Sequence, residues 1–183
     1  MKKHGGIAVK AVLVVDMIND FVTGRFGSKR AEHIVPAVGA LIDRARSAGI
    51  PVFYLRDSHH PEDPELRVWG RHAMAGTRGS EIVKELRPER GEKVLAKRQY
   101  SGFFSSSLDR TLKTAGVDEI YFAGISADIC VQHNVADAFF HGYRLTVVSD
   151  CVESMNPARK KAALKYMKEI YGTTIVSLGK VKF

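Results

Sequence analysis

Strand-like and helix-like patterns alternate along this chain, and the alternation restricts the folds open to it. Short apolar runs occupy residues 11–16, 51–55, 93–96, 119–123, 143–148 and 173–178. Helical spacing or helix-capping residues mark the stretches around 34–45, 80–86, 105–115, 130–139 and 157–171. Because the runs are apolar on both faces, they fit a parallel sheet covered by helices on both sides. The sequence predicts one α/β domain over residues 1–183, a three-layer αβα arrangement around a six-stranded, mostly parallel, doubly wound sheet.

Charge and cysteine content narrow the classes of partner. The net charge of +8 permits nucleic-acid binding, but the basic residues are scattered and no nucleic-acid motif accompanies them. No apolar run is long enough to cross a membrane. The two cysteines, Cys130 and Cys151, are too few for a disulfide scaffold. We expect a cytoplasmic protein that acts on small molecules, binds neither nucleic acid nor membrane, and has Cys151 as a packed structural thiol.

Three chemically complementary residues follow strand-like runs. Asp16 ends the first run, Lys97 follows the third, and Cys130 begins a helix after the fourth. In doubly wound sheets these positions share the carboxyl edge, where active sites lie. A helix start favours a thiolate, so we expect a lowered pKa for Cys130 and nucleophilic chemistry on a carbonyl. Taken singly, Asp16 could be a turn cap, Lys97 a surface lysine and Cys130 a buried small side chain; their joint placement favours catalysis.

A second group follows the second strand-like run. Asp57 and His59 are two residues apart, so an extended segment directs both to one side, and His72 returns from the long polar stretch 56–78. One carboxylate and two imidazoles leave coordination positions open on zinc, iron or manganese. His60 competes as a ligand, and the stretch could also be merely polar. Its length without periodicity makes it a candidate functional loop.

Three separated segments resemble the isochorismatase-like cysteine hydrolases, which include nicotinamidases and N-carbamoylsarcosine amidase. They are residues 14–21 (VVDMINDF), Lys97 with 100–103 (YSGF), and residues 124–131 (GISADICV). The resemblance covers nearly the whole chain in order. It implies a six-stranded parallel sheet between helices and cleavage of an amide C–N bond through a thioester.

The resemblance also implies roles for individual residues. Cys130 would be the nucleophile, Asp16 the proton shuttle and Lys97 their charge partner. The backbone amides of Ser126 and Cys130 would form an oxyanion hole, beside a cis Ile125–Ser126 peptide bond. Asp57, His59 and His72 would hold a divalent metal, zinc first.

The substrate is the least determined part of this prediction. Phe21 and Trp69 could stack on a flat ring, although ordinary packing would explain both aromatics equally well. The resemblance places nicotinamide first and N-carbamoylsarcosine-like ureido amides second. Two departures from the nicotinamidase pattern bear on that order: Ser58 where many have Trp, and a short segment after Lys97. Relatives are often oligomeric, so a homo-oligomer is expected; an inactive basic binding module is the alternative from another class.

Overall fold

The computed structural model describes residues 8–183, and its centre is a parallel sheet. The strands run in the order β3-β2-β1-β4-β5-β6, and every neighbouring pair is parallel. Their bounds are β1 Lys10–Val15, β2 Val52–Asp57, β3 Lys93–Lys97, β4 Glu119–Ile125, β5 Arg144–Glu153 and β6 Thr174–Val176. The predicted six-stranded α/β fold is confirmed.

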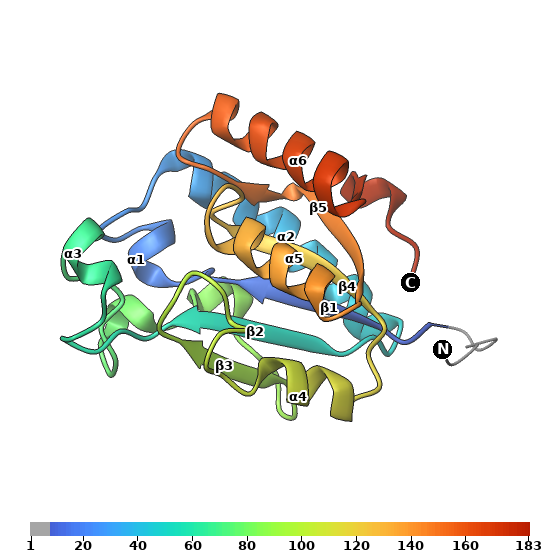
Figure 1. The fold of residues 1–183 in the computed structure, drawn as a ribbon, viewed down its shortest axis with the longest axis horizontal. Coiled ribbons are helices and arrows are strands. Elements are labelled where there is room, and N and C mark those ends of the chain that lie inside the picture. Colours follow the sequence, from blue (N-terminus) through green and yellow to red (C-terminus); the bar gives the residue numbers. More distant parts are fainter. Residues whose placement is uncertain (1–7) are drawn as a thin grey trace.

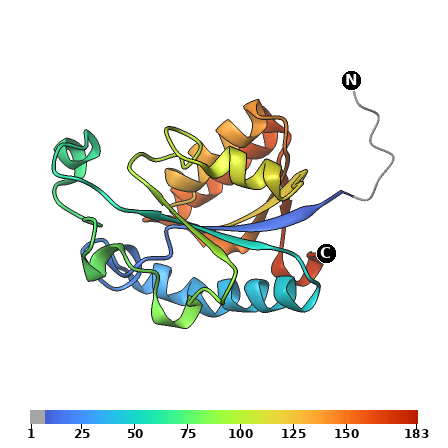
Figure 2. The same cartoon turned by 90° about the horizontal axis from the view of Figure 1, so that it is seen from below.

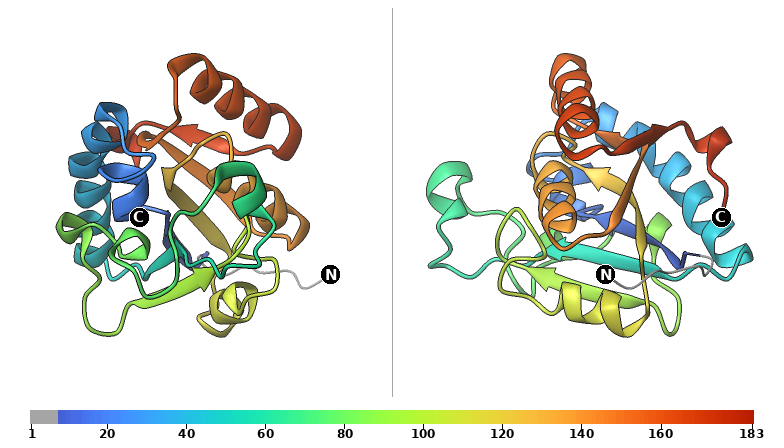
Figure 3. Two further views of the ribbon diagram at one scale, coloured as in Figure 1. Left: turned by 90° about the vertical axis from the view of Figure 1, so that its left-hand side faces the viewer. Right: turned by 45° about the vertical axis from the view of Figure 1, so that its right-hand side comes forward.

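Helices cover both faces of the sheet and make three layers (Figures 1 and 2). One face packs against α2 (Lys29–Ser47), whose buried stripe includes Ile34, Val38 and Leu41. The other carries α4 (Leu108–Thr114), α5 (Cys130–Phe140) and α6 (Pro157–Tyr171). The shorter helices α1 (Asn19–Val22) and α3 (Glu65–Trp69) lie beyond the carboxyl ends of the strands. The left panel of Figure 3 views the sheet from this end. None of the helices in residues 8–183 has the length and apolar character of a membrane span.

The chain order of the strands reverses between β1 and β4, so this boundary is the switch point of the sheet. Gly124 allows the two strands to meet there. It has a φ of 116°, and a Cβ on it would lie 1.9 Å from the carbonyl oxygen of Val15. Asp16 follows β1 directly, with a φ of 52° that is uncommon for a non-glycine residue. The switch point therefore places Asp16 beside the segment leading to Cys130.

One predicted helix is wrong. Residues 80–86 do not form a helix; the segment contains two short 3₁₀ turns, at Arg78–Ser80 and Lys84–Leu86. Val83 and Leu86 are buried three residues apart, which resembles a helical face. The backbone instead pairs with the loop after β1, because the amide of Val83 donates to the carbonyl of Met17 at 3.0 Å.

Candidate active site

Lys97 connects the residues at the carboxyl edge of the sheet. Its Nζ lies 2.7 Å from Oδ2 of Asp16, 2.5 Å from Oδ1 of Asp57 and 3.6 Å from Sγ of Cys130. All four side chains are buried. The amide of Asp57 also donates to Oδ1 of Asp16 at 2.8 Å, which fixes the orientation of that carboxylate. The structure brings together the three residues predicted to carry catalysis and adds Asp57 to them.

The pKa values of this group follow from burial and close charges. Burial and the neighbouring Asp57 raise the pKa of Asp16 to about 7, even though Lys97 lowers it. The pKa of the Cys130 thiol is also raised, because burial and the two carboxylates outweigh the ammonium. The expected lowering of the Cys130 pKa is therefore wrong for the resting site. The site rests as a thiol beside a carboxylate whose pKa suits proton exchange at neutral pH.

Cys130 is the first residue of α5, as predicted, and α5 has no side-chain cap at that end. The peptide bond Ile125–Ser126 is cis, as the resemblance implied. Within residues 8–183, the backbone amides of Ser126 and Cys130 donate no hydrogen bond to another backbone group. They are free to donate to a developing oxyanion.

Asn134 joins the Lys97 segment to the helix that carries Cys130. Its Oδ1 accepts from the amide of Gly102 at 2.9 Å, and its Nδ2 donates to the carbonyl of Cys130 at 2.8 Å. The side chain is fully buried. It lies one helical turn after Cys130 and fixes the position of the loop that follows Lys97.

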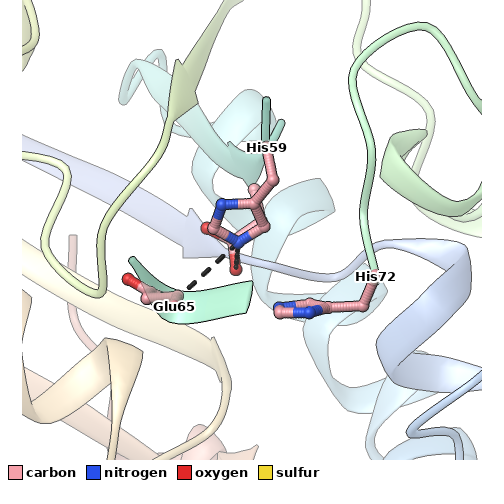
Figure 4. A group of neighbouring side chains, drawn as sticks. His59, Glu65 and His72 are labelled. Atoms are coloured by element: carbon pink, nitrogen blue, oxygen red, sulfur yellow. Dashed lines mark ion pairs between the residues drawn. The ribbon is translucent and has the colours of Figure 1, made fainter. Parts of the chain in front are cut away.

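A second buried group adjoins the first. One donor atom from each of Asp57, His59, Glu65 and His72 lies within 4.8 Å of every other. Figure 4 shows His59 and His72 directed toward one another beside Glu65, whose Oε2 is 3.8 Å from Nε2 of His59. His60 is exposed and lies outside the group. The predicted set of three possible metal ligands is thus gathered, with Glu65 as a fourth.

The chemistry of these donors fits a divalent metal. Nε2 of His59 and Oε1 of Glu65 are buried without a hydrogen-bond partner. The other ring nitrogens are occupied: Nδ1 of His59 is 3.1 Å from Asp63, and Nδ1 of His72 is 2.7 Å from the carbonyl of Gly70. This arrangement directs each Nε2 into the group, as second-shell partners of metal-bound histidines do.

The electrostatics of the group point the same way. Burial and the nearby Asp57 raise the pKa of Glu65 to about 7. Burial opposes charge on His59, but contacts with Asp57 and Asp63 raise its pKa overall. A cation bound here would relieve the repulsion between the two carboxylates.

A cavity of about 360 Å³ opens onto both groups. Its lining includes Cys130, Ser126, Asp57, Glu65 and His72. Phe21 and Trp69, the predicted substrate contacts, also line it, together with Phe26 and Arg25. The space suits a small molecule reached by the thiol at one side.

Sequence reasoning missed Glu65, Asp63 and Arg25. Glu65 and Asp63 are buried carboxylates in the polar stretch between His59 and His72. Acidic residues in such a stretch are ordinarily those of a solvent-exposed loop. An excess of carboxylates around two possible histidine ligands was the available signal for them. Arg25 had no signal, since it belongs to no motif.

The fold is a three-layer α/β domain with a buried thiol, carboxylate and ammonium together at the carboxyl edge of its sheet. The chain belongs to the isochorismatase family: the model of the isochorismatase domain matches residues 10–177. The predicted enzyme class, a hydrolase of amide C–N bonds, is confirmed by this assignment.

Similar proteins cover most of the chain. The solved N-carbamoylsarcosine amidase of Thermoplasma acidophilum is 41% identical, with a TM-score of 0.89 over 95% of this chain and 99% of that one. The pyrazinamidase of Pyrococcus horikoshii, solved in complex with zinc, is 28% identical, with a TM-score of 0.86 over 92% and 99%. The ureidoacrylate amidohydrolase RutB of Caulobacter segnis is 30% identical, over 88% of this chain and 80% of its own.

Proposed function

We propose that this chain is an amidohydrolase in which Cys130 attacks the carbonyl carbon of a small amide. The observation that carries the proposal is the contact of Sγ with the Lys97 ammonium at 3.6 Å, beside the Asp16 carboxylate, on the wall of an open cavity. Asp16 accepts the thiol proton as the sulfur–carbon bond forms. The amides of Ser126 and Cys130 donate to the carbonyl oxygen as it becomes negative.

The same carboxyl group then completes the reaction. Protonated Asp16 gives its proton to the leaving nitrogen, the C–N bond breaks, and ammonia or an amine departs. Asp16, again a carboxylate, takes a proton from water as the water oxygen bonds to the thioester carbon. The C–S bond then breaks to release the acid, and Asp16 returns the proton to the sulfur, which restores the thiol and the carboxylate. Lys97 remains charged throughout, because its pKa is raised well above the ordinary value by the two carboxylates, against burial.

Asp57, His59, Glu65 and His72 would hold a divalent cation. Zinc is the first candidate, because the similar pyrazinamidase of Pyrococcus horikoshii was solved in complex with zinc. When bound, such a cation supplies a Lewis acid that can anchor a substrate heteroatom at the cavity wall.

Two classes of small amide are the candidate substrates. The 41% identity with an N-carbamoylsarcosine amidase favours an N-carbamoyl amide, as does the RutB similarity. Nicotinamide, first in the sequence-based order, is the second candidate: the cavity wall contains Phe21 and Trp69 beside the possible metal ligands, which suits a flat heteroaromatic ring.

Ammonia release tests the proposal. Cys130→Ala should abolish release from a panel of small amides, whereas Cys151→Ala should retain it, because Cys151 is a buried thiol that is absent from the cavity lining. Circular dichroism would establish that both variants fold. Full activity in Cys130→Ala would sink the proposal; salt-sensitive nucleic-acid binding without turnover would favour a basic binding module.

We also infer a homo-oligomer in the cytoplasm, formed from a single domain over residues 1–183, of which the first seven lie outside the described residues. Phe140 on α5 is 74% exposed and Ile170 on α6 is 55% exposed, which suits an interface. A monomer in analytical ultracentrifugation at micromolar concentration would contradict the oligomer.

A further inference from the structure

The charges around the active-site cavity are compensated with one exception. The carboxylates on its wall each have a cationic or imidazole neighbour: Asp57 has Lys97 at 2.5 Å, Glu65 has His59 at 3.8 Å, and Glu153 has Arg30 at 2.6 Å. Arg25 also lines the cavity, but it forms no salt bridge with any carboxylate in residues 8–183. Arg25 is therefore a cationic residue on the cavity wall whose charge is not paired with a carboxylate of residues 8–183.

The guanidinium of Arg25 is placed by the cavity walls themselves. Its Nη2 lies 3.4 Å from the carbonyl oxygen of Trp69, and its Cζ is 5.4 Å from the ring centroid of Phe26. Guanidinium has five N–H donors in a planar fork, so a single contact leaves most of them available. Arg25 thus presents donors at the cavity while two of its walls support it.

Gly70 makes room for this placement. A Cβ on Gly70 would lie 2.8 Å from Nη2 of Arg25, so the end of this flexible side chain would have to move from its place. Gly70 has a φ of 72° and lies two residues before His72, which contacts its carbonyl oxygen. The loop that carries a possible metal ligand therefore leaves space for the arginine.

We propose that Arg25 binds a carboxylate at the far end of the substrate, so that the preferred amides are small N-carbamoyl acids. This rests on the proposed amidohydrolase function. The planar fork of arginine matches a carboxylate with two parallel hydrogen bonds. The Phe26 ring lies beside the guanidinium and the Trp69 carbonyl oxygen accepts from it, while the Arg25 side chain remains exposed to an entering ligand. An uncharged amide such as nicotinamide has no carboxylate with which the Arg25 guanidinium could form an ion pair.

Arg25 could instead only brace Trp69 and Phe26. That role would affect acidic and neutral ligands alike, because it changes the wall and not the charge recognised. A comparison of an acid with a neutral analogue of similar shape separates the two roles.

Binding to a chemically inert protein is the direct test. In the Cys130→Ala background, isothermal titration would compare N-carbamoylglycine with its uncharged N-methylamide. We expect the acid to bind more tightly, and Arg25→Gln to weaken the acid by about tenfold or more while the neutral analogue changes less than about twofold. Arg25→Lys keeps the charge without the fork and should fall between. Arg67→Gln is the matched control, since Arg67 is exposed on α3 and absent from the cavity lining.

The outcomes separate this inference from the function on which it rests. Equal weakening of both ligands by Arg25→Gln, or no preference for the acid, would overturn the role of Arg25. If the role of Arg25 were overturned, ammonia release from neutral amides by the wild-type protein would still support the proposed amidohydrolase function. Arg25-dependent binding of the acid without ammonia release from any amide would support the carboxylate site and refute the hydrolase.

Discussion

Replacing Lys97 by Met tests whether its ammonium holds the active-site charges together. The substitution leaves the carboxylates of Asp16 and Asp57, now at 2.7 Å and 2.5 Å from Nζ, buried without a cation. Removing one partner of a buried ion pair costs about 3–5 kcal/mol. Each kcal/mol lowers the melting temperature of a domain of this size by about 2–4 °C, so we expect a decrease of roughly 6–20 °C near pH 8.

The loss of stability should depend on pH, and its sign follows from Asp57. Burial alone would raise the pKa of Asp57, but Lys97 and His59 lower it below the ordinary 3.8. In the wild type, Asp57 therefore contributes stability above pH 3.8, which is lost as the pH falls through its lowered folded value. Without Lys97, burial would raise that pKa, and the variant would lose stability as the pH rises through the raised value. The difference between the two proteins should be largest at pH 8 and shrink toward pH 5.

Urea unfolding of both proteins at pH 8, 6.5 and 5 measures this difference. Lys113→Met is the control, because its 2.7 Å pair with Asp109 is on the surface, and such pairs contribute only about 0–1 kcal/mol. Ammonia release by Lys97→Met should also fall by about 100-fold or more, since the thiolate loses its counter-charge. A destabilisation that equals the control, or that does not change with pH, would refute the electrostatic account of this group.

Two further predictions address the thiol and the metal. Asp16→Asn removes a negative charge that raises the pKa of Cys130, so iodoacetamide should label Cys130 at lower pH, while ammonia release is lost. Peptide mass spectrometry measures the labelling, with Cys151 as the internal reference. An unchanged pH profile of labelling would contradict the argument. Glu65→Gln removes a metal donor and should weaken zinc binding, measured by chelator competition, by about tenfold or more. The same substitution should raise the melting temperature of the metal-free protein at pH 8, because burial disfavours the Glu65 charge. Glu85→Gln, an exposed control, should change neither quantity, and wild-type zinc affinity in Glu65→Gln would exclude Glu65 as a ligand.

Local patterns predicted the position of Cys130 but not its proton affinity. A strand followed by small residues and a helix places the thiol at a helix start in any fold of this class. The expected pKa considered only that helix start. The opposite direction arises from complete burial and from Asp16 and Asp57, which come from other strands. A pKa depends on all charges in contact, and spacing along one segment does not contain them.

Asp57 shows why the remainder of the site could not be predicted. Spacing to His59 assigned it to the metal group alone, but Asp57 is also the register partner of Lys97 across β2 and β3. That register follows from how the 58–92 connection returns to the sheet edge. Residues 58–78 of this connection have no periodicity from which its path could be inferred, and the helical spacing around 80–86 predicted the wrong structure. The same path brings Glu65 and His72 back over the cavity and Gly70 against Arg25. One carboxylate thus belongs to both groups, with Oδ1 on the ammonium and Oδ2 3.6 Å from His59, so a substitution at Asp57 changes the charge balance of the thiol and of the metal donors together.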